Sequence, residues 1–297
     1  MRDRLLRYVD KGLLEKVVIH FSRVRPENII EGVPNIFFAH DLINDPESRI
    51  LSNGGYRKFS KLVFVSYWQR DQYMLAYNIP YECCTVIENA IEKNFVPQTK
   101  PTDTINFIYH TTPHRGLQLL YPVFSQLAMI HENIHLDVFS SFGVYGWAER
   151  DKQYEMLFDQ LRRHPNITYH GAQPNDEVLE ALDKSHIFLY PCIWQETSCI
   201  AMIEAIKSGV LVIHPNLAAL PETASECTKM YDYTENSQTH MNKCFHITNS
   251  VINSIKDDPL YLEKYTHNPR CQLPVNSIES FTDKWSKLLS SLTSHKM

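Results

Sequence analysis

Short apolar runs alternate with longer amphipathic stretches along most of the chain. Four runs near the N-terminus predict strands, and beyond residue 104 a regular alternation predicts five more, with helices between them. Strands separated by helices of this length indicate βαβ units and a parallel sheet. The predicted strands are Val17–Phe21, Asn35–Ala39, Leu62–Ser66, Cys84–Ile87, Ile105–Tyr109, Ile134–Phe139, Ile167–Tyr169, Ile187–Tyr190 and Val210–Ile213.

The stretches between these strands have the spacing of helices that bury one face. The tail Ser277–Leu292 repeats this spacing, with apolar residues at Ile278, Phe281 and Trp285 and again near its end, so it predicts a last amphipathic helix. The other predicted helices are Trp68–Tyr77, Leu117–His131, Asp151–Arg163, Asp176–Lys184 and Ser198–Ser208.

A segment with two prolines and no large apolar residue, 97–104, has the composition of a linker. It divides the chain into a first domain, 1–96, and a second domain, 105–275, followed by a C-terminal helix within 276–297. The length of 297 residues agrees with two domains. We therefore expect an α/β protein built from two parallel sheets.

Composition excludes some classes of protein. The chain is 43% hydrophobic and 21% charged, which suits a globular core, and its net charge of −5 argues against a nucleic-acid binder. It has no run of 18 apolar residues and no signal-peptide core at its N-terminus, so we expect no membrane-spanning helix. Seven cysteines without a CxxC pair predict reduced thiols and a cytoplasmic location.

The segment 190–213 carries the most informative pattern. A strand ends at Tyr190, Glu196 and Glu204 lie eight residues apart, and Gly209 precedes the next strand. The N-terminus of the intervening helix offers free N–H groups and a positive dipole end, which attract a diphosphate. The helical part of the spacing rises on the order of 10 Å, so one carboxylate could meet a sugar and the other a ribose. The alternative is a surface helix with two solvated glutamates.

This segment resembles the E-x7-E donor-site motif of retaining family-4 glycosyltransferases, which have the GT-B fold of two Rossmann-like domains. The match includes the Tyr-Pro strand end, the Glu204–Ala205 pair and Gly209. Many family members have Gly-Phe-Gly after the first glutamate, and the chain departs from that pattern at Thr197, Ser198 and Cys199.

The resemblance implies a role for each residue of the motif. Glu204 would bind the ribose hydroxyls of the donor, and Glu196 would contact the sugar and stabilise the cation-like transition state. The helix N-terminus would hold the diphosphate through Thr197, Ser198, Cys199 and Ile200.

The loop after the strand Ile105–Tyr109 contains Thr112, Arg115 and Gly116. Arginine is a fork of donors matched to phosphate, and glycine permits close backbone approach. This loop resembles the family's loop that neutralises the donor diphosphate, although the lysine that usually accompanies the arginine is not obvious here. The alternative is an arginine in solvent at a helix start. The resemblance places Gly171 near the donor base, with a plain strand-to-helix turn as the equal alternative.

The sequence Phe37-Phe-Ala-His40-Asp41 resembles the family's His-Asp at the cleft, which places His40 against the donor sugar; a structural histidine is the alternative. The resemblance covers most of residues 35–290. Family members have roughly twice as many residues before the linker, so the first domain is expected to be reduced. The resemblance also implies that the C-terminal helix crosses back to the first domain; a helix that simply caps a domain is the alternative.

A zinc-protease pattern, H-E-x-x-H, occurs at 131–135. That chemistry needs both histidines on one helix, and here a strand is predicted to begin at Ile134, so we expect no metal site. No Asp-x-Asp tripeptide occurs either, so a divalent ion is not implied.

The leading hypothesis is a retaining, metal-independent glycosyltransferase that moves a sugar from a nucleotide-diphosphate donor to a hydroxyl of a carbohydrate or lipid-linked acceptor. No cofactor beyond the donor is expected. A non-catalytic nucleotide-sugar-binding or partner subunit is the alternative, and a nucleotide-sugar epimerase is a weaker one. The sequence does not indicate the base, the sugar, the acceptor or the oligomeric state.

Overall fold

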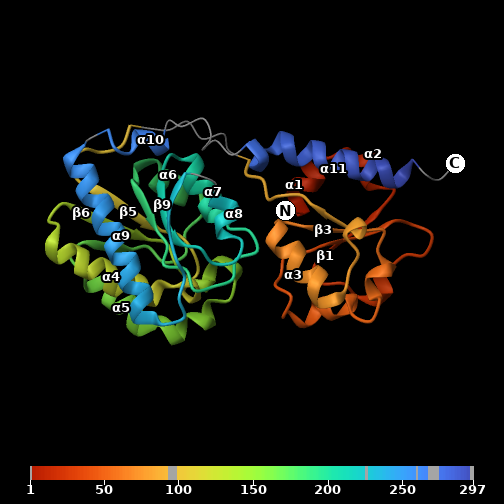
Figure 1. Ribbon diagram of the computed structural model, residues 1–297, viewed down its shortest axis with the longest axis horizontal. Helices are drawn as coiled ribbons and strands as arrows, with labels where there is room; N and C mark the ends of the chain where they lie inside the picture. Colours follow the sequence, from red (N-terminus) through yellow and green to blue (C-terminus); the bar gives the residue numbers. More distant parts are fainter. Residues whose placement is uncertain (1, 93–98, 225–226, 259, 267–273, 295–297) are drawn as a thin grey trace. The chain divides into compact units, whose positions relative to one another are not determined.

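The computed structural model describes residues 2–92, 99–224, 227–258, 260–266 and 274–294 (Figure 1). They form two compact units. Unit 1 comprises Met1–Glu92, Gln195–Ile200 and Pro274–Met297, and unit 2 comprises Lys93–Trp194 and Ala201–Leu273. The predicted linker, 97–104, lies partly outside the described residues, and the predicted domain boundaries stay a prediction.

Unit 1 is built on a parallel sheet with the strand order β1-β2-β3-β4. Its strands are β1 (Val18–Phe21), β2 (Asn35–Phe38), β3 (Lys61–Phe64) and β4 (Cys84–Val86). Its helices are α1 (Arg2–Tyr8), α2 (Lys11–Leu14), α3 (Tyr67–Tyr77) and α11 (Ile278–Thr293).

Alternate residues of the central strands enter two separate cores, because successive side chains of a strand point to opposite faces. On β2, Ile36 and Phe38 pack into a core with side chains of α1 and α11. Phe37 enters the other core, which includes Tyr73 of α3. Both faces of the sheet are therefore covered by helices, as parallel sheets require.

Helix α11 forms part of unit 1 although it follows the whole of unit 2 in the sequence. It lies beside α1 and α2 (Figure 1). Its Trp285 is fully buried, and the indole packs edge-on against the ring of Phe38 with centroids 5.0 Å apart. The predicted helix that returns to the first domain is confirmed.

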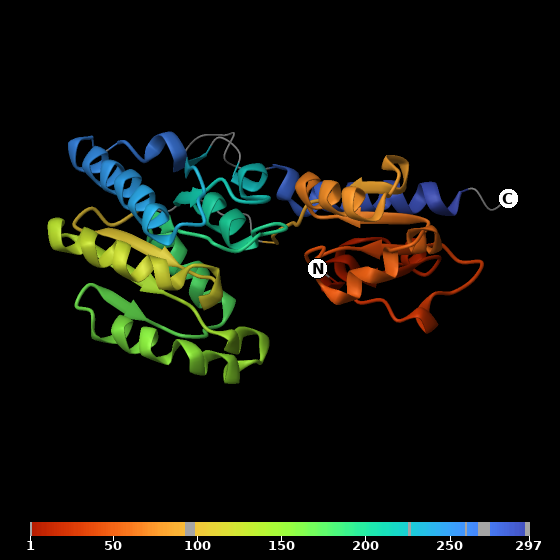
Figure 2. The same ribbon diagram turned by 60° about the horizontal axis from the view of Figure 1, so that its bottom comes forward.

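Unit 2 is built on a parallel sheet with the strand order β10-β9-β8-β5-β6-β7. Helices α4 and α9 lie side by side, as both views show (Figures 1 and 2). The strands are β5 (Ile105–Tyr109), β6 (Ile134–Val138), β7 (Ile167–Tyr169), β8 (Ile187–Leu189), β9 (Leu211–Pro215) and β10 (Thr228–Tyr231). The helices are α4 (Leu117–Ile130), α5 (Glu155–Arg163), α6 (Asn175–Lys184), α7 (Ile200–Lys207), α8 (Leu220–Ala224), α9 (Ser237–Asp257) and α10 (Glu263–Thr266).

The strand order of unit 2 reverses at β5. From β5 the chain moves outward to β6 and β7, then returns to β8 on the other side of β5. Loops that follow neighbouring strands on either side of such a reversal diverge and leave a crevice at their carboxyl ends, where ligands of α/β proteins bind. The loops after β5 and β8 are therefore the first place to look for a site.

Three sequence expectations differ from the structure. The helix predicted from Asp151 begins at Glu155, after a 3₁₀ segment over Ala148–Tyr154. The helix predicted from Ser198 begins at Ile200. The expectation of reduced thiols is wrong at Cys227, which is disulfide-bonded. The spacing of cysteines in the sequence does not show which of them the fold brings within bonding distance.

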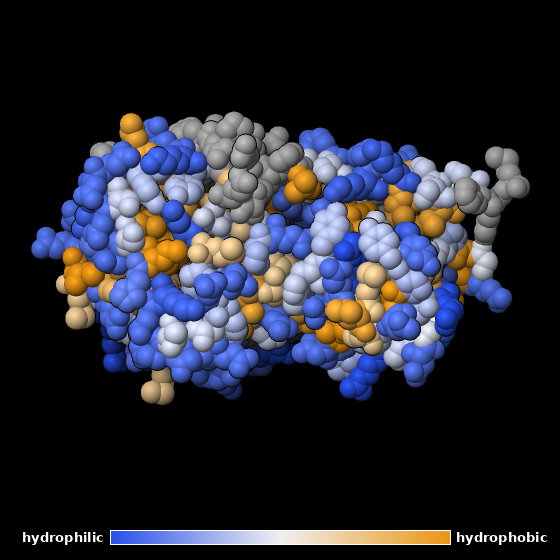
Figure 3. Space-filling view, in the orientation of Figure 1, coloured by the Kyte–Doolittle hydropathy of each residue, from blue (hydrophilic) through white to orange (hydrophobic). Residues whose placement is uncertain are grey.

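No helix among the described residues is both long and apolar enough to cross a membrane. Figure 3 shows hydrophilic residues over most of the visible face of each unit, with apolar residues in scattered patches. That distribution is usual for the surface of a globular domain.

Candidate functional site

The loop between β5 and α4 contains an unusual number of buried polar atoms. Several of its side-chain atoms are buried without a hydrogen-bond partner among the described residues, including His110 Nδ1, Thr111 Oγ1, Thr112 Oγ1 and His114 Nδ1. Buried polar groups are nearly always hydrogen-bonded to protein, water or a ligand, so a cluster of exceptions marks a place where polar groups can bind. Of these residues, the sequence pattern singled out Thr112 alone.

His110 connects this loop to α7. Burial lowers the pKa of its imidazole to about 4, so the ring is neutral near pH 7. Its Nε2 lies 3.1 Å from the carbonyl oxygen of Ala201, in the first turn of α7. A carbonyl can only accept, so Nε2 carries the proton and Nδ1 is left as a hydrogen-bond acceptor. The loop thus offers a fixed acceptor beside the hydroxyls of Thr111 and Thr112.

Gly116 brings the loops after β5 and β8 together. Its φ is +126°, and a Cβ atom there would overlap the backbone carbonyl oxygen of Pro191. The N–H of Ile193 donates to the carbonyl of Arg115 over 3.3 Å, directly beside this approach. The expected close backbone approach at Gly116 therefore occurs, and here it is to the chain itself.

A second arginine shares the surroundings of Arg115. Burial, followed by the positive charges of Arg115 and Arg150, lowers the pKa of His114 to about 4. Both guanidinium groups therefore lie within electrostatic range of one imidazole. The Arg150 guanidinium lies 4.3 Å from the centroid of the Trp147 ring. Arg150 was not predicted from the sequence, because the 3₁₀ segment that contains it, Ala148–Tyr154, has no recognisable pattern.

The two glutamates of the E-x7-E pattern belong to different units. Glu204 lies inside α7 in unit 2 and is 8% exposed, whereas Glu196 lies in unit 1 and is 4% exposed. Both glutamates are therefore buried, which rules out the alternative of a surface helix with two solvated glutamates. Because α7 begins at Ile200, the helical part of their spacing rises about 6 Å rather than the expected 10 Å.

The residues expected at the helix N-terminus mostly precede it. Thr197, Ser198 and Cys199 lie in the loop before α7, and Ile200 is its first residue. The Thr197 hydroxyl donates to the carbonyl oxygen of His40 over 3.0 Å, so two predicted site residues meet within unit 1.

His40 follows β2 and is fixed on several sides. Its backbone N–H donates to Ser22 Oγ over 2.7 Å, and its ring packs against Phe38 with centroids 4.2 Å apart. Burial lowers the pKa of the imidazole to about 4. Nε2 is buried without a hydrogen-bond partner among the described residues. A neutral, immobile imidazole with one unused nitrogen suits a substrate contact.

Gly171 follows β7, which lies two positions from β5 in the sheet. Its φ of +71° turns the chain from β7 toward α6, and a Cβ there would meet only the Tyr169 ring, at 4.0 Å. This geometry accounts for the glycine as a turn residue, and its expected place near a donor base stays a prediction.

The H-E-x-x-H pattern is divided between two elements, as expected. His131 caps α4 and His135 lies within β6. Their Nε2 atoms lie 2.8 Å from Asn249 Oδ1 and 3.0 Å from Thr168 Oγ1, respectively. The described residues contain no group of three or more candidate ligands that could hold a metal ion.

Comparison with known proteins relates this geometry to a family. The family model described as glycosyl transferases group 1 matches residues 88–238, just over half of the chain. One subunit of the phosphatidylinositol N-acetylglucosaminyltransferase of Homo sapiens is 22% identical over 204 residues. The matched part is 66% of this chain and 41% of the relative, so the chain spans about two fifths of the relative's length.

Two solved structures share the architecture. A glycosyltransferase from Rickettsia africae is 16% identical with a TM-score of 0.72, and the match covers 99% of this chain and 82% of that one. Anabaena Alr3699/HepE in complex with UDP-glucose is 14% identical with a TM-score of 0.64, covering 87% and 72%. At these identities the likeness shows the fold, and the predicted GT-B class with two Rossmann-like domains is confirmed.

Proposed function

The chain belongs to the glycosyl transferases group 1 family, and we propose that it transfers a sugar from a nucleotide-diphosphate donor to an acceptor hydroxyl with retention of anomeric configuration. The bond between the sugar and the diphosphate breaks, and a bond to the acceptor oxygen forms. The nucleoside diphosphate leaves with the bonding electron pair and takes up the hydroxyl proton. No step requires a metal ion or a further cofactor.

The β5–α4 loop is the observation that carries this proposal. It joins a positive guanidinium, Arg115, to an acceptor and hydroxyls at His110, Thr111 and Thr112 that are buried without a hydrogen-bond partner among the described residues. A diphosphate and its ribose need both kinds of group, since phosphate oxygens accept hydrogen bonds and ribose hydroxyls donate them.

Arg115 would stabilise the negative charge that develops on the leaving diphosphate. Arg150 is the candidate for the second cation, in place of the lysine that usually accompanies the arginine in the family. Preorganised charge of this kind lowers a barrier by several kcal/mol in comparable sites, where losing one donor costs roughly 3–4 kcal/mol. Neither arginine changes protonation state during the reaction, because a guanidinium stays charged.

The remaining roles follow the resemblance to retaining family-4 enzymes. Glu204 binds the ribose hydroxyls, and Glu196 contacts the sugar and stabilises its cation-like transition state. His40 contacts the donor sugar through its unused Nε2. Retention implies attack by the acceptor from the face that the diphosphate leaves.

The acceptor class is suggested by the human relative, whose name specifies transfer of N-acetylglucosamine to phosphatidylinositol. We expect an acceptor hydroxyl on a carbohydrate or a lipid-linked group, and we expect the protein to be located in the cytoplasm. Fractionation of cells that express the chain would test the location.

Calorimetric titration with UDP tests the donor site, because the Anabaena neighbour was solved with UDP-glucose. Arg115→Ala and Glu204→Gln should each weaken binding by roughly tenfold or more, as expected for loss of a charge-assisted contact. The matched control is Arg163→Ala, which removes an exposed guanidinium from the last turn of α5. Equal affinity in all four proteins would refute the assigned site, and a panel of other nucleoside diphosphates identifies the base.

A further inference from the structure

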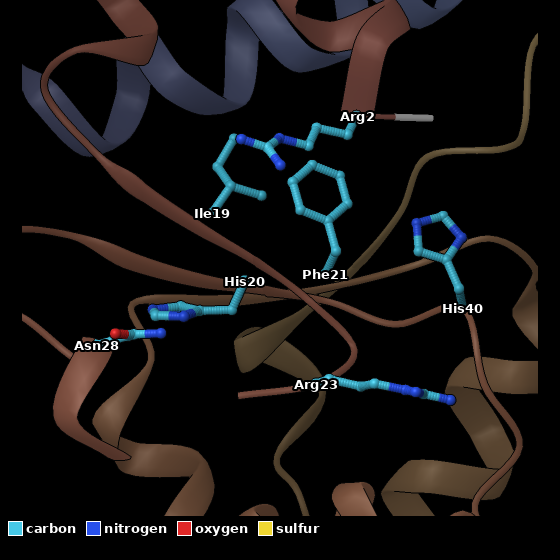
Figure 4. Close-up of a pocket in the computed structure, with 7 residues that line it drawn as sticks. All are labelled: Arg2, Ile19, His20, Phe21, Arg23, Asn28 and His40. Atoms are coloured by element: carbon cyan, nitrogen blue, oxygen red, sulfur yellow. The ribbon is translucent and has the colours of Figure 1, made fainter. Parts of the chain in front are cut away.

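Cationic side chains are placed differently in the two units. In unit 1, Arg2 and Arg23 are exposed and line a pocket of about 490 Å³ beside β1. They lie on either side of Phe21 and point apart, so they do not converge on one ligand (Figure 4). In unit 2, Lys100 lies in the segment before β5 and is held by contacts with the protein itself.

The Lys100 ammonium group binds the C-terminal ends of two helices. Its Nζ donates to the carbonyl oxygen of Leu182, in the last turn of α6, and to that of Ser208, directly after α7, each over 3.1 Å. Carbonyl groups at the C-terminus of a helix carry its negative dipole end, and several lack a donor within the helix, so they suit a cation. Lys100 thus joins α6 and α7 to the segment that leads into β5.

The position of this cation is tightly constrained. Burial lowers the pKa of Lys100 to about 8, and the nearby charge of Asp183 offsets only part of that shift. The group is therefore still charged near pH 7. A partly buried charge destabilises a protein unless polar groups compensate it, and the two helix-end carbonyls do so here.

The carbonyl of Ser208 belongs to the turn that ends α7. The N–H of Ser208 donates to the carbonyl of Glu204 over 3.0 Å, and the N–H of Val210 donates to that of Ala205 over 2.9 Å. Gly209, with a φ of +66°, permits this turn. A single residue, Ser208, therefore connects Lys100 to the backbone of Glu204.

The other end of α7 is held from the opposite end of β5. His110 directly follows β5, and its Nε2 donates to the carbonyl of Ala201 over 3.1 Å. Helix α7 has only eight residues, and a helix of that length is not stable alone, so its position depends on its contacts. The two segments that flank β5 therefore fix both ends of the helix that carries Glu204.

We propose that Lys100 is a positioning residue of the donor site, which places the Glu204 carboxylate against the ribose by fixing the C-terminal end of α7. This inference rests on the proposed function, in which Glu204 binds the ribose hydroxyls. Lys100 itself does not touch the donor. Its loss should therefore impair recognition of the ribose and leave the contacts of the β5–α4 loop with the diphosphate in place.

Calorimetric titration of the full chain with UDP and with 2′,3′-dideoxy-UDP, which lacks both ribose hydroxyls, tests this role. The wild type should prefer UDP by roughly tenfold or more, and Glu204→Gln should lose most of that preference. Lys100→Met, which keeps the length of the side chain without its charge, should reduce the preference by roughly threefold or more. Its affinity for 2′,3′-dideoxy-UDP should equal that of the wild type.

Two further variants separate positioning from a general effect on the fold. Lys100→Arg keeps the cation and should retain more of the preference than Lys100→Met does. Lys184→Met is the matched control, because it makes the same change at the exposed last residue of α6, and it should leave the preference unchanged. Circular dichroism checks that each variant is folded. If Lys100→Met does not fold, Lys100→Gln takes its place, with the same expected loss because it is also uncharged.

A double variant tests whether Lys100 acts through Glu204. Adding Lys100→Met to Glu204→Gln should cause no further loss of preference, because the carboxylate that Lys100 positions is already absent. An additive loss would overturn the inference. So would a wild-type preference in Lys100→Met, an equal loss in Lys184→Met, or a lower preference in Lys100→Arg than in Lys100→Met.

Failure of the proposed function has a different signature in the same titrations. A wild type that binds UDP and 2′,3′-dideoxy-UDP equally, or binds neither, would remove the role of Glu204 and the positioning role with it. A wild type that prefers UDP through Glu204, with Lys100→Met unchanged from it, would leave the proposed function standing and remove the role of Lys100 alone.

Discussion

At the scale of single residues, the site in unit 2 depends on polar atoms that are buried with no hydrogen-bond partner in the described part of the chain. His110, Thr111 and Thr112 directly follow strand β5. Burying their polar atoms without hydrogen bonds costs stability, and binding a ligand in this loop would offset that cost. Arg115 and Gly116 could be recognised from the sequence, because an arginine before glycine at a strand end has a stated chemical use. Thr111 and His114 could not, because nothing in a sequence shows which polar atoms the fold will leave unpaired.

Gly116→Ala should destabilise the protein strongly and weaken UDP binding. The backbone at Gly116 has a φ of +126°, and the added Cβ would overlap the Pro191 carbonyl oxygen. The backbone strain alone costs roughly 1–3 kcal/mol, and the overlap adds to it. Urea unfolding measures the loss of stability.

Gly146→Ala is the control for that measurement. Gly146 also has a positive φ, +75°, but a Cβ there has nothing within 4 Å. It should therefore cost only about 1 kcal/mol. If both variants lose the same stability, the close approach of the two loops is not what requires glycine at position 116.

At the scale of elements, apolar periodicity located almost every strand, because both faces of a parallel sheet are buried. It missed β10 and α9, together with the short helices α8 and α10. Strand β10 lies at the sheet edge with one buried residue, so it has no apolar run. Helix α9 is rich in serine, threonine and asparagine, which weakens its helical pattern, although its N-cap residue Asn236 was a usable signal.

Helix α11 should contribute a large part of the stability of unit 1. Trp285→Ala removes a fully buried indole from the core that α11 shares with Phe38. Such truncations cost about 3–5 kcal/mol. Urea unfolding followed by circular dichroism should show a loss of this size.

Lys287→Ala provides the comparison on the same helix. Its side chain is 76% exposed and paired with Asp283 at the surface, so its removal should cost less than about 1 kcal/mol. Similar losses for both variants would show that α11 is not held by its apolar face.

At the scale of the whole molecule, several buried histidines couple stability to pH. His214 is fully buried in β9, and burial lowers its pKa from 6.5 to about 4. Between these two values the unfolded chain binds more protons than the folded one, so stability falls as the pH falls. The contribution is complete above 6.5 and is lost as the pH approaches 4.

Urea unfolding at about pH 7 and about pH 5 measures this effect, which should reach about 2 kcal/mol for one fully buried histidine. His214→Gln should reduce the difference between the two pH values. His246→Gln replaces an exposed histidine and should leave it unchanged. Parallel pH profiles for His214→Gln and the wild type would contradict the assignment.

Contacts between segments far apart in the sequence could be predicted only where the resemblance to a known family implied them. The return of α11 to unit 1 followed from the family. The approach of Gly116 to Pro191 joins segments far apart in sequence, and such contacts depend on the packing of loops rather than on any local pattern.

The central claim is that the chain transfers a sugar from a nucleotide diphosphate to an acceptor hydroxyl. Proton NMR follows the anomeric signal of the sugar directly. The spectra are recorded on the full chain with each of a panel of UDP-sugars, in the presence and in the absence of glycerol phosphate as the acceptor. The predicted result is release of UDP and a new glycoside with the donor's anomeric configuration, abolished in Glu204→Gln. UDP binding without release would show a non-catalytic binding protein, and an altered sugar still attached to UDP would show an epimerase; either result would contradict the account.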